Sequence, residues 1–283
     1  MTELVERLVP DELWVLFRRV VPPTVVKRQQ GGGRRRAGDR EVLAAVIFVA
    51  TSGCTWRQLP PVFGPAWQTV YRRFAQWSSD RVWARLHRVV LDELGARGEL
   101  DWSRCAIDSV SVRAVKGLLT GPNPTDRGKL GSKIHLVTDR SGLPLSLGIS
   151  GANMHDSQGL EPLIRGIPPI RSRRGPRRRR PAKLHADKGY DYDHLRRWLR
   201  GRGIRHRIAR RGVESSQRLG RHRWVVERTV SWLAGCRRLH RRYERKPEHF
   251  LAFVSIAATL ICHRRLAKKS TLNPTRTATR DAA

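Results

Sequence analysis

Hydrophobic periodicity divides the chain into a helical first third and a longer part in which short strands alternate with helices. Between residues 66 and 77, Trp67, Val70, Phe74 and Trp77 recur at helical spacing and predict one buried helix face. From Leu100 onward, short β-branched runs such as RCAIDSVSVRA replace that spacing, as expected of strands. Helices are predicted at 11–21, 41–52, 66–77, 81–94, 157–167, 192–203, 224–243 and 247–268.

The second part of the chain predicts a mixed α/β sheet. The runs SKIHLVTD and LPLSLGIS flank the turn signal DRSG and indicate an antiparallel hairpin. KLHAD and IRHRIA are predicted strands that alternate with helices, which favours a sheet with parallel neighbours. We therefore expect an all-helical N-terminal domain over 1–98, an α/β domain over 99–270 and a disordered tail over 271–283.

The charge balance points to a polyanionic partner. Lys and Arg number 57 against 24 Asp and Glu, a formal net charge of +33. Nucleic acid is the preferred partner, because neutralised phosphates release counterions, and a membrane surface is the rival. The run RRGPRRRR would bind DNA without sequence preference, or would simply be solvated.

Other compositional features favour the cytoplasm and no membrane partner. No apolar run reaches the ~18 residues of a spanning helix, and Phe250–Cys262 reads as a buried helix. The first residues are acidic and lack a signal-peptide pattern. Four scattered cysteines argue against a zinc ribbon or a disulfide framework and fit a reducing compartment.

Three acidic residues lie in ordered contexts and form a candidate metal site. Asp108 follows Ala106 and Ile107 on a strand, Asp187 ends the strand KLHAD, and Glu227 lies early in a long helix. Neighbouring parallel strands can present two carboxylates side by side, and a packed helix can add a third. Clustered carboxylates repel one another and need a cation. Oxygen ligands suit Mg²⁺ (or Mn²⁺), and two such ions can promote phosphodiester cleavage. Taken singly, each acid is more readily explained as a surface residue, a helix cap or a salt-bridge partner.

The helix at 66–77 is a candidate recognition helix of a helix-turn-helix. The alternative is an amphipathic helix of a bundle that touches no groove. Its polar face can read base edges or hold phosphates and comprises Gln68, Thr69, Arg72, Arg73 and Gln76.

The sequence supports two alternative roles for each of two further segments of the α/β part. Lys133 and His135 alternate with Ile134 and Leu136 and would contact either phosphate or solvent. In NMHDS, Asp156 is predicted to be a helix N-cap, and the alternative is that His155 and Asp156 assist the metal site.

Long ordered motifs give the chain a resemblance to a known family. AIDSVSVRA, GPNPTDRGKLGSKIHLVTDRSGLPL, GANMHDS, LHADKGYD and RWVVERTVSWLAGCRRLHRRYER occur in this order, after TWRQLPPVFGPAWQTVYRRFAQW. Over about residues 10–265 the chain resembles the transposases of bacterial insertion sequences, most closely the insertion sequence five family (IS4/IS5-like) among the DDE transposases. The resemblance implies an RNase H-like catalytic fold and makes Asp108, Asp187 and Glu227 the metal-binding triad.

One position departs from the resemblance. Related transposases often carry Lys or Arg seven residues after the catalytic Glu, where this chain has Ala234. Arg223 lies one turn before Glu227, and Arg238 lies about three turns after it, so both would share its helix face. We therefore expect these two arginines to contact the DNA backbone near the cut.

The expected function is that of a transposase that binds the terminal inverted repeats of an insertion sequence. It would cut DNA there with two Mg²⁺ (or Mn²⁺) ions and transfer the freed strand to target DNA, without a small-molecule substrate. Bringing two ends together suggests a homodimer on DNA, in the cytoplasm and at the nucleoid. The alternatives are a structure-selective nuclease or Holliday-junction-type resolvase on the same fold, and a non-catalytic repressor derived from a transposase.

Overall fold

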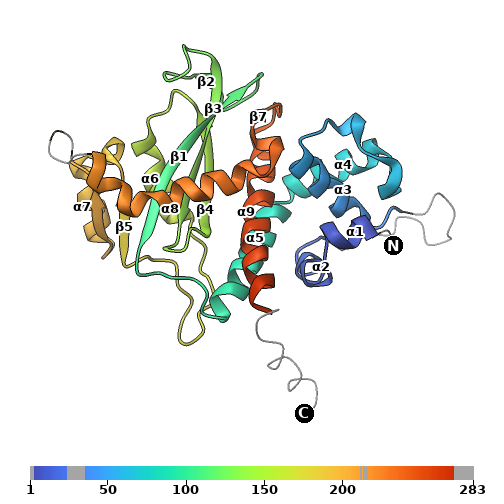
Figure 1. The fold of residues 1–283 in the computed structure, drawn as a ribbon, viewed down its shortest axis with the longest axis horizontal. Coiled ribbons are helices and arrows are strands. Elements are labelled where there is room, and N and C mark those ends of the chain that lie inside the picture. The colour runs from blue at the N-terminus through green and yellow to red at the C-terminus, as the bar shows by residue number, and fades with distance from the viewer. Residues whose placement is uncertain (1–2, 24–35, 211, 213–215, 271–283) are drawn as a thin grey trace.

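The structure, a computed structural model, describes residues 3–23, 36–210, 212 and 216–270. The expected tail at 271–283 and most of the basic loop before residue 36 lie outside this range. Figure 1 shows a sheet with helices around it and a cluster of shorter helices to one side. The helices are α1 (Glu3–Leu8), α2 (Asp11–Arg18), α3 (Asp39–Ser52), α4 (Trp67–Ser79), α5 (Val82–Ala96), α6 (Leu160–Gly166), α7 (Asp193–Gly201), α8 (Ser216–Ala234) and α9 (Pro247–Ser270).

The strands of the described chain form one mixed sheet, which confirms the predicted α/β class. The central order is β4-β3-β1-β5-β6, with β1 antiparallel to β3 and parallel to β5. The predicted hairpin is β3–β4, and β5 and β6 are the predicted parallel neighbours. Two short strands, β2 and β7, were not predicted, because two residues carry no periodicity. The strands are β1 (Cys105–Ala114), β2 (Gly121–Pro122), β3 (Leu130–Thr138), β4 (Pro144–Gly151), β5 (Lys183–Ala186), β6 (Arg205–Ile208) and β7 (Arg241–Arg242).

Helices cover both faces of this sheet. In Figure 1, α8 crosses in front of the strands from the α7 side towards α9, and it packs against β1, β3 and β5. The segment before α6 packs on the other face, where the position of a Gly159 Cβ would lie 3.0 Å from the His135 ring. α8 therefore covers the face opposite to His135.

The helical first third shares its core with the sheet. α5 and α4 pack along α9, which also contacts β4, so one hydrophobic cluster runs through both parts. By length and composition α9 could cross a membrane, in contrast to the expectation of no such run, but 72% of the qualifying window is buried inside the protein. This helix is the shared core of the two parts.

The predicted boundaries of α3, α5 and α8 are among those that differ from the structure. α3 begins at Asp39 itself, with Gly38 in the cap position. Before α5, Arg81 holds the cap position with φ 54°, where Asp80 was expected. α8 starts earlier than predicted and ends at Ala234, because Gly235 follows and closes the last turn by bonding to the Trp232 carbonyl at 3.2 Å.

Candidate active site

Two of the predicted carboxylates lie on adjacent parallel strands at the same level. β1 pairs with β5 so that Cys105 faces Leu184 and Ala106 faces His185. Asp108 follows Ala106 by two residues, and Asp187 follows His185 by two residues. Neighbouring strands lie about 4.8 Å apart, so continuing this register sets the two aspartates side by side.

Both aspartates belong to the sheet face that α8 covers. Side chains alternate along a strand, so Asp108 shares a face with Ala106, and the extended backbone of Asp187 keeps it on the face of His185. Ala106 and His185 line a small cavity together with Val225 of α8. The covering helix is thus the element that carries the third predicted carboxylate.

Backbone amides fix one oxygen of each aspartate. The Ser109 amide donates to Asp108 Oδ1 at 2.8 Å, and the Gly189 amide donates to Asp187 Oδ1 at 2.8 Å. A Cβ on Gly189 would approach Asp187 Oδ1 to 2.9 Å, so a side chain at this position would have to displace the Asp187 carboxylate. Both carboxylates are half-buried.

Glu227 is exposed on α8, which is anchored to the sheet by its neighbours. Val225 and Val226 are buried, and Thr229 Oγ1 donates to the Gly142 carbonyl at 2.7 Å. Arg228 donates to the Ser141 carbonyl at 2.7 Å. These contacts fix the position of α8 on the sheet, and therefore the position of the Glu227 backbone on the face that carries both aspartates.

The three carboxylates do not form a closed ligand set. Across the residues that the structure describes, no three His, Cys, Asp or Glu side chains are grouped so that they could hold a metal ion. The aspartate pair suits a hard, oxygen-seeking cation, since its donors are carboxylate oxygens on fixed backbone. Glu227 is not joined to that pair in this conformation.

A second polar cluster lies on the opposite face of the sheet, beside Asp108 in sequence. Lys133 Nζ lies 2.9 Å from Asp156 Oδ1 and donates to the Met154 carbonyl at 2.8 Å. Ser109 Oγ donates to the same Asp156 oxygen at 2.7 Å. Burial would raise the pKa of Asp156, but the hydrogen bonds from Lys133 and Ser109 hold that pKa below its usual value.

This cluster corrects two expectations. Asp156 is not the N-cap, because the side chain of His155 takes that role by accepting from the Ser157 amide. The Lys133 side chain, 12% exposed, is committed to Asp156 and does not face solvent. No periodicity in the sequence marks this pair, because its two members are 23 residues apart.

Only part of the polar face of α4 is exposed and free to contact DNA. Gln68, Arg72 and Gln76 are exposed, and Thr69 is half-buried. Arg73 is not available, since its guanidinium lies 2.6 Å from Asp39 and its side chain is 11% exposed. α3 and α4 are joined by residues 53–66, which is longer than the three- or four-residue turn of a standard helix-turn-helix.

Arg238 does not share the helix face of Glu227, and that expectation is wrong. α8 ends before it, and Arg238 lies in the following 3₁₀ turn. Its side chain is 8% exposed and pairs with Glu244 at 2.8 Å. Its guanidinium also donates to the Cys54 carbonyl at 3.1 Å. The side chain of the other expected DNA contact, Arg223, lies outside the described part of the chain.

Comparison with known proteins identifies the family. Residues 9–87 match the family described as "Putative transposase of IS4/5 family", and residues 102–262 match the family "Transposase DDE domain". The chain is 40% identical to the "Putative transposase for insertion sequence element IS402" of Burkholderia cepacia, over 79% of this chain and 93% of that protein. It is 26% identical to the "Transposase for insertion sequence element IS1106" of Neisseria meningitidis serogroup B, over 46% of this chain and 43% of that protein.

Similarity to solved structures is weak. The crystal structure of the Mos1 strand transfer complex aligns with 86% of this chain and 81% of that chain, at 12% identity and a TM-score of 0.31. A pre-cleavage Mos1 transpososome aligns with 90% of this chain and 86% of that chain, at 11% identity and a TM-score of 0.27.

The predicted resemblance is therefore confirmed by the two family matches and by a relative that aligns over most of both chains. The mixed sheet with helices on both faces is the RNase H-like fold of the DDE transposases, preceded by a helical region. The chain belongs to the IS4/5 family of transposases, enzymes of the DDE type that cleave DNA and transfer its strands.

Proposed function

We propose that this transposase cuts DNA at the terminal inverted repeats of its insertion sequence with Asp108, Asp187 and Glu227 as its metal-binding carboxylates. The observation that carries this assignment is the parallel register of β1 and β5, which sets Asp108 and Asp187 side by side on the face under α8. Glu227 lies on that helix, two residues after Val225, which lines a cavity together with Ala106 and His185.

The chemistry consists of two displacements at phosphorus. Water attacks the phosphodiester at the element's end, forms a new P–O bond and releases a 3′-hydroxyl. That hydroxyl then attacks a phosphodiester of target DNA, and the bond to the target's 3′-oxygen breaks. Bound divalent ions, Mg²⁺ or Mn²⁺ and two in number, would acidify the attacking hydroxyl and stabilise the leaving oxygen. The side chains of the protein hold the ions and orient DNA, so no covalent protein–DNA intermediate forms.

The exposed polar residues of α4 are proposed to contact the inverted repeats. Gln68, Arg72 and Gln76 extend into solvent from a helix whose other face is buried. Side chains of these types can bind base edges and phosphates. Thr69, at the margin of this surface, is a secondary candidate, and Lys133 and Arg73 are not, since both are ion-paired.

The assembly is proposed to be a homodimer on DNA in the bacterial cytoplasm, without a membrane partner. Transposition requires two ends to be held together, and the described residues of one chain present one candidate carboxylate pair. The net charge of +33 supports association with the nucleoid, because it favours long-range attraction to DNA.

A cleavage and joining assay on DNA that carries the element's ends tests this assignment. With Mg²⁺ present, Asp187→Asn should reduce both steps to background and leave end binding intact, since the amide keeps the shape and loses the charge. Asp193→Asn is the matched control, because Asp193 is an exposed acid six residues further along the chain, in α7. Normal cleavage by Asp187→Asn would show that the triad is misassigned.

The same assay separates the alternatives. A wild-type protein that binds ends and never cuts them would be a repressor derived from a transposase. A protein that cuts branched DNA and never joins ends to a target would be a resolvase-type nuclease. Glu227→Gln, with Glu248→Gln as its exposed control, tests whether the carboxylate on α8 is needed for the cut.

A further inference from the structure

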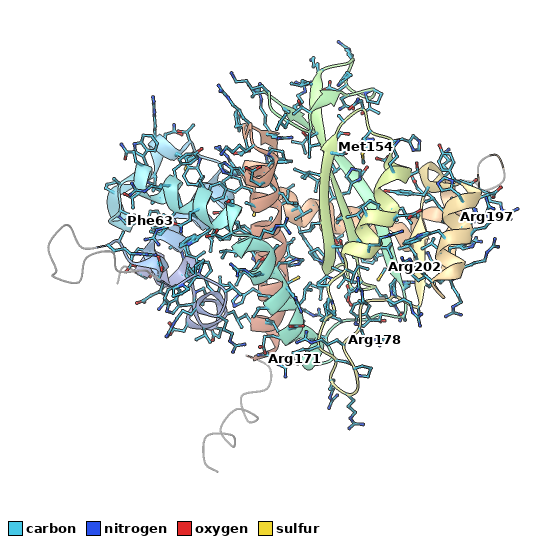
Figure 2. All side chains as sticks on the ribbon, turned by 180° about the vertical axis from the view of Figure 1, so that it is seen from behind. Phe63, Met154, Arg171, Arg178, Arg197 and Arg202 are labelled. Carbon is cyan, nitrogen blue, oxygen red and sulfur yellow. The ribbon has the colours of Figure 1, made fainter. Side chains whose placement is uncertain are left out.

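An arginine-rich groove lies at the end of the sheet that is opposite to the candidate active site. It has a volume of about 1210 Å³ and is bounded by the end of α6, the segment before β5 and the end of α7. Figure 2 shows Arg178 and Arg202 on the same side of the sheet-containing part of the molecule. We refer to this feature as the arginine groove; its arginines are Arg165, Arg177, Arg178, Arg179, Arg180 and Arg202.

Most of this positive charge is not neutralised within the described chain. Arg165 pairs with Glu161 at 3.1 Å, and Arg177 pairs with Asp92 at 2.8 Å. The remaining four arginines are exposed, and none of them forms an ion pair with a carboxylate of the described residues. The groove therefore carries about four unbalanced charges.

Uncharged partners hold these guanidinium groups in place. Arg179 donates to the Arg165 carbonyl at 3.0 Å, and Arg180 donates to the Arg202 carbonyl at 3.2 Å. Arg178 lies over the Trp102 ring at 5.6 Å. Guanidinium groups that are oriented in this way lose less entropy when they bind phosphate oxygens, which favours a phosphate ligand.

The groove offers little to nucleobases. Trp198 is an aromatic residue that lines it. This side chain packs against the hydrophobic core, and two cations lie over its ring, with Arg165 at 5.6 Å and Arg202 at 4.5 Å from the ring centroid. A base therefore has no open indole face on which to stack. A ligand in the groove is held by its phosphates, and such contacts carry no sequence information.

The groove is distant from the carboxylates along the parallel strands. Arg177 to Arg180 precede β5, and Arg202 precedes β6, so both segments lie where these parallel strands begin. Asp187 follows the last residue of β5, a strand of about 13 Å in length. The part of a duplex that lies in the groove is accordingly at the other end of β5 from the phosphodiester that reacts.

We propose that the arginine groove binds the backbone of the target DNA duplex, without sequence preference, while the carboxylates act elsewhere. This proposal rests on the proposed function, because the protein must hold a target whose sequence it does not read. The inverted repeats need base contacts, which the groove lacks, so target DNA is the occupant that its chemistry fits.

The test is the affinity for a random 30-base-pair duplex, measured by fluorescence anisotropy in EDTA over a range of salt concentrations. The variant R178Q/R179Q/R202Q should bind at least about tenfold more weakly, and the slope of log K against log salt should fall by about 2 to 3. The control R7Q/R18Q/R88Q removes three exposed arginines from α1, α2 and α5 and should change the slope by less than about 1. The lysine variant R178K/R179K/R202K keeps the charge and should restore most of the slope.

Two results would overturn the proposal. One is an equal loss of slope in the glutamine variant and its control, both folded by circular dichroism. The other is intact duplex binding with lost binding to phosphatidylserine vesicles, which would assign the groove to a membrane surface. A strand-transfer assay tests the proposal independently. The glutamine variant should cut the element's ends normally and should need a higher concentration of target DNA for joining. Since duplex binding is measured without cleavage, a failed triad assignment leaves this test valid.

Discussion

Arg238 and Glu244 form an ion pair that is almost entirely shielded from water. Their side chains are 8% and 5% exposed, and the guanidinium also lies over the rings of Tyr243 and Phe253. Burial removes both charges from water, and each charge is stabilised mainly by its partner. Removing one partner therefore lowers the free energy of unfolding more than removing both, because it leaves a buried charge without compensation. At the scale of single residues, this pair therefore contributes to folding, where the sequence suggested DNA contact.

Arg238→Met should lower the free energy of unfolding by about 3 to 5 kcal/mol, because it leaves the Glu244 carboxylate buried without its partner. Arg238→Met/Glu244→Gln should be more stable than the single variant by at least about 1 kcal/mol. Urea denaturation measures both values. A drop in affinity for end DNA at unchanged stability would instead support the DNA contact.

The roles that the sequence did not predict belong to residues whose contact partners are remote along the chain. Asp187 was identifiable, since it ends an apolar run and its neighbour in the sheet follows from strand order. Asp156 was not, because its partners Lys133 and Ser109 lie 23 and 47 residues away. Pairing of this kind depends on sheet register, which local patterns do not specify.

In individual helices, too, local spacing predicts which face is buried, whereas the role of a polar side chain depends on tertiary contacts. Spacing predicted most of the buried face of α4, as Val70, Phe74 and Trp77 are buried, whereas Trp67 is half-buried. Its polar face was predicted as one surface, yet Arg72 is exposed and Arg73 is paired with Asp39. Neighbouring arginines of one helix thus have different roles, which depend on whether another element supplies a carboxylate.

These two arginines provide a matched experiment on α4. Arg72→Gln should weaken binding to end DNA by about 1 to 3 kcal/mol and leave the melting temperature unchanged. Arg73→Gln should lower the free energy of unfolding by about 1.5 to 3 kcal/mol, since it removes a charged hydrogen bond to a half-buried Asp39. Anisotropy and thermal melting measure the two effects. The reverse pattern would mean that α4 does not face DNA in the complex.

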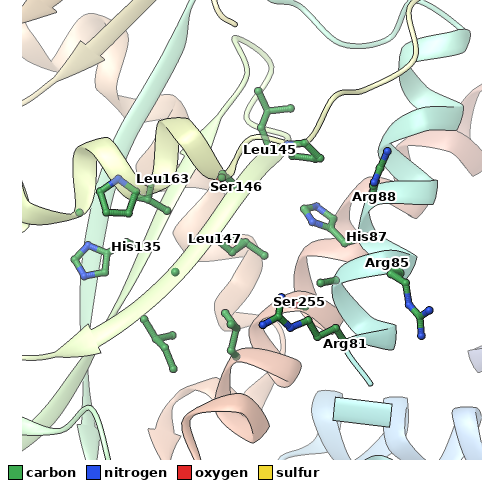
Figure 3. Close-up of a pocket in the computed structure, with 18 of the residues that line it drawn as sticks. Arg81, Arg85, His87, Arg88, His135, Leu145, Ser146, Leu147, Leu163 and Ser255 are labelled. Carbon is green, nitrogen blue, oxygen red and sulfur yellow. The ribbon is translucent and has the colours of Figure 1, made fainter. Parts of the chain in front are cut away.

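Over the whole molecule, the order of strands and helices could be predicted, but the unity of the core could not. The helical first third was expected as a domain of its own, and its buried residues pack against those of the sheet through α9. Amphipathic spacing shows that a face is buried and does not show what buries it. Figure 3 shows one consequence: His87 of α5 lies opposite Ser146 and Leu147 of β4, at the junction of the two parts.

Acid should destabilise this junction through its buried histidines. Burial lowers the pKa of His87 to about 4, although its Nε2 lies 3.0 Å from the Pro144 carbonyl, and burial also lowers the pKa of His135 to about 4. An unfolded histidine titrates near 6.5. Each of these two histidines therefore lowers the protein's free energy of unfolding by about 1.4 kcal/mol per pH unit as the pH falls from 6.5 to 4. Burial raises the pKa of Asp139 to about 6, so this carboxyl acts in the opposite sense between pH 6 and 4 and offsets one histidine.

The contribution of His87 can be isolated by His87→Gln, whose amide can still donate to the Pro144 carbonyl and does not titrate. Urea denaturation of both proteins from pH 7 to 4 gives the difference in unfolding free energy at each pH. Above pH 6.5 this difference should be constant, and below that value it should change in favour of the variant by about 1.4 kcal/mol per unit. His135 and Asp139 are common to both proteins and cancel. Parallel curves across this range would mean that His87 becomes protonated without a cost to folding, as when water reaches the contact between α5 and β4.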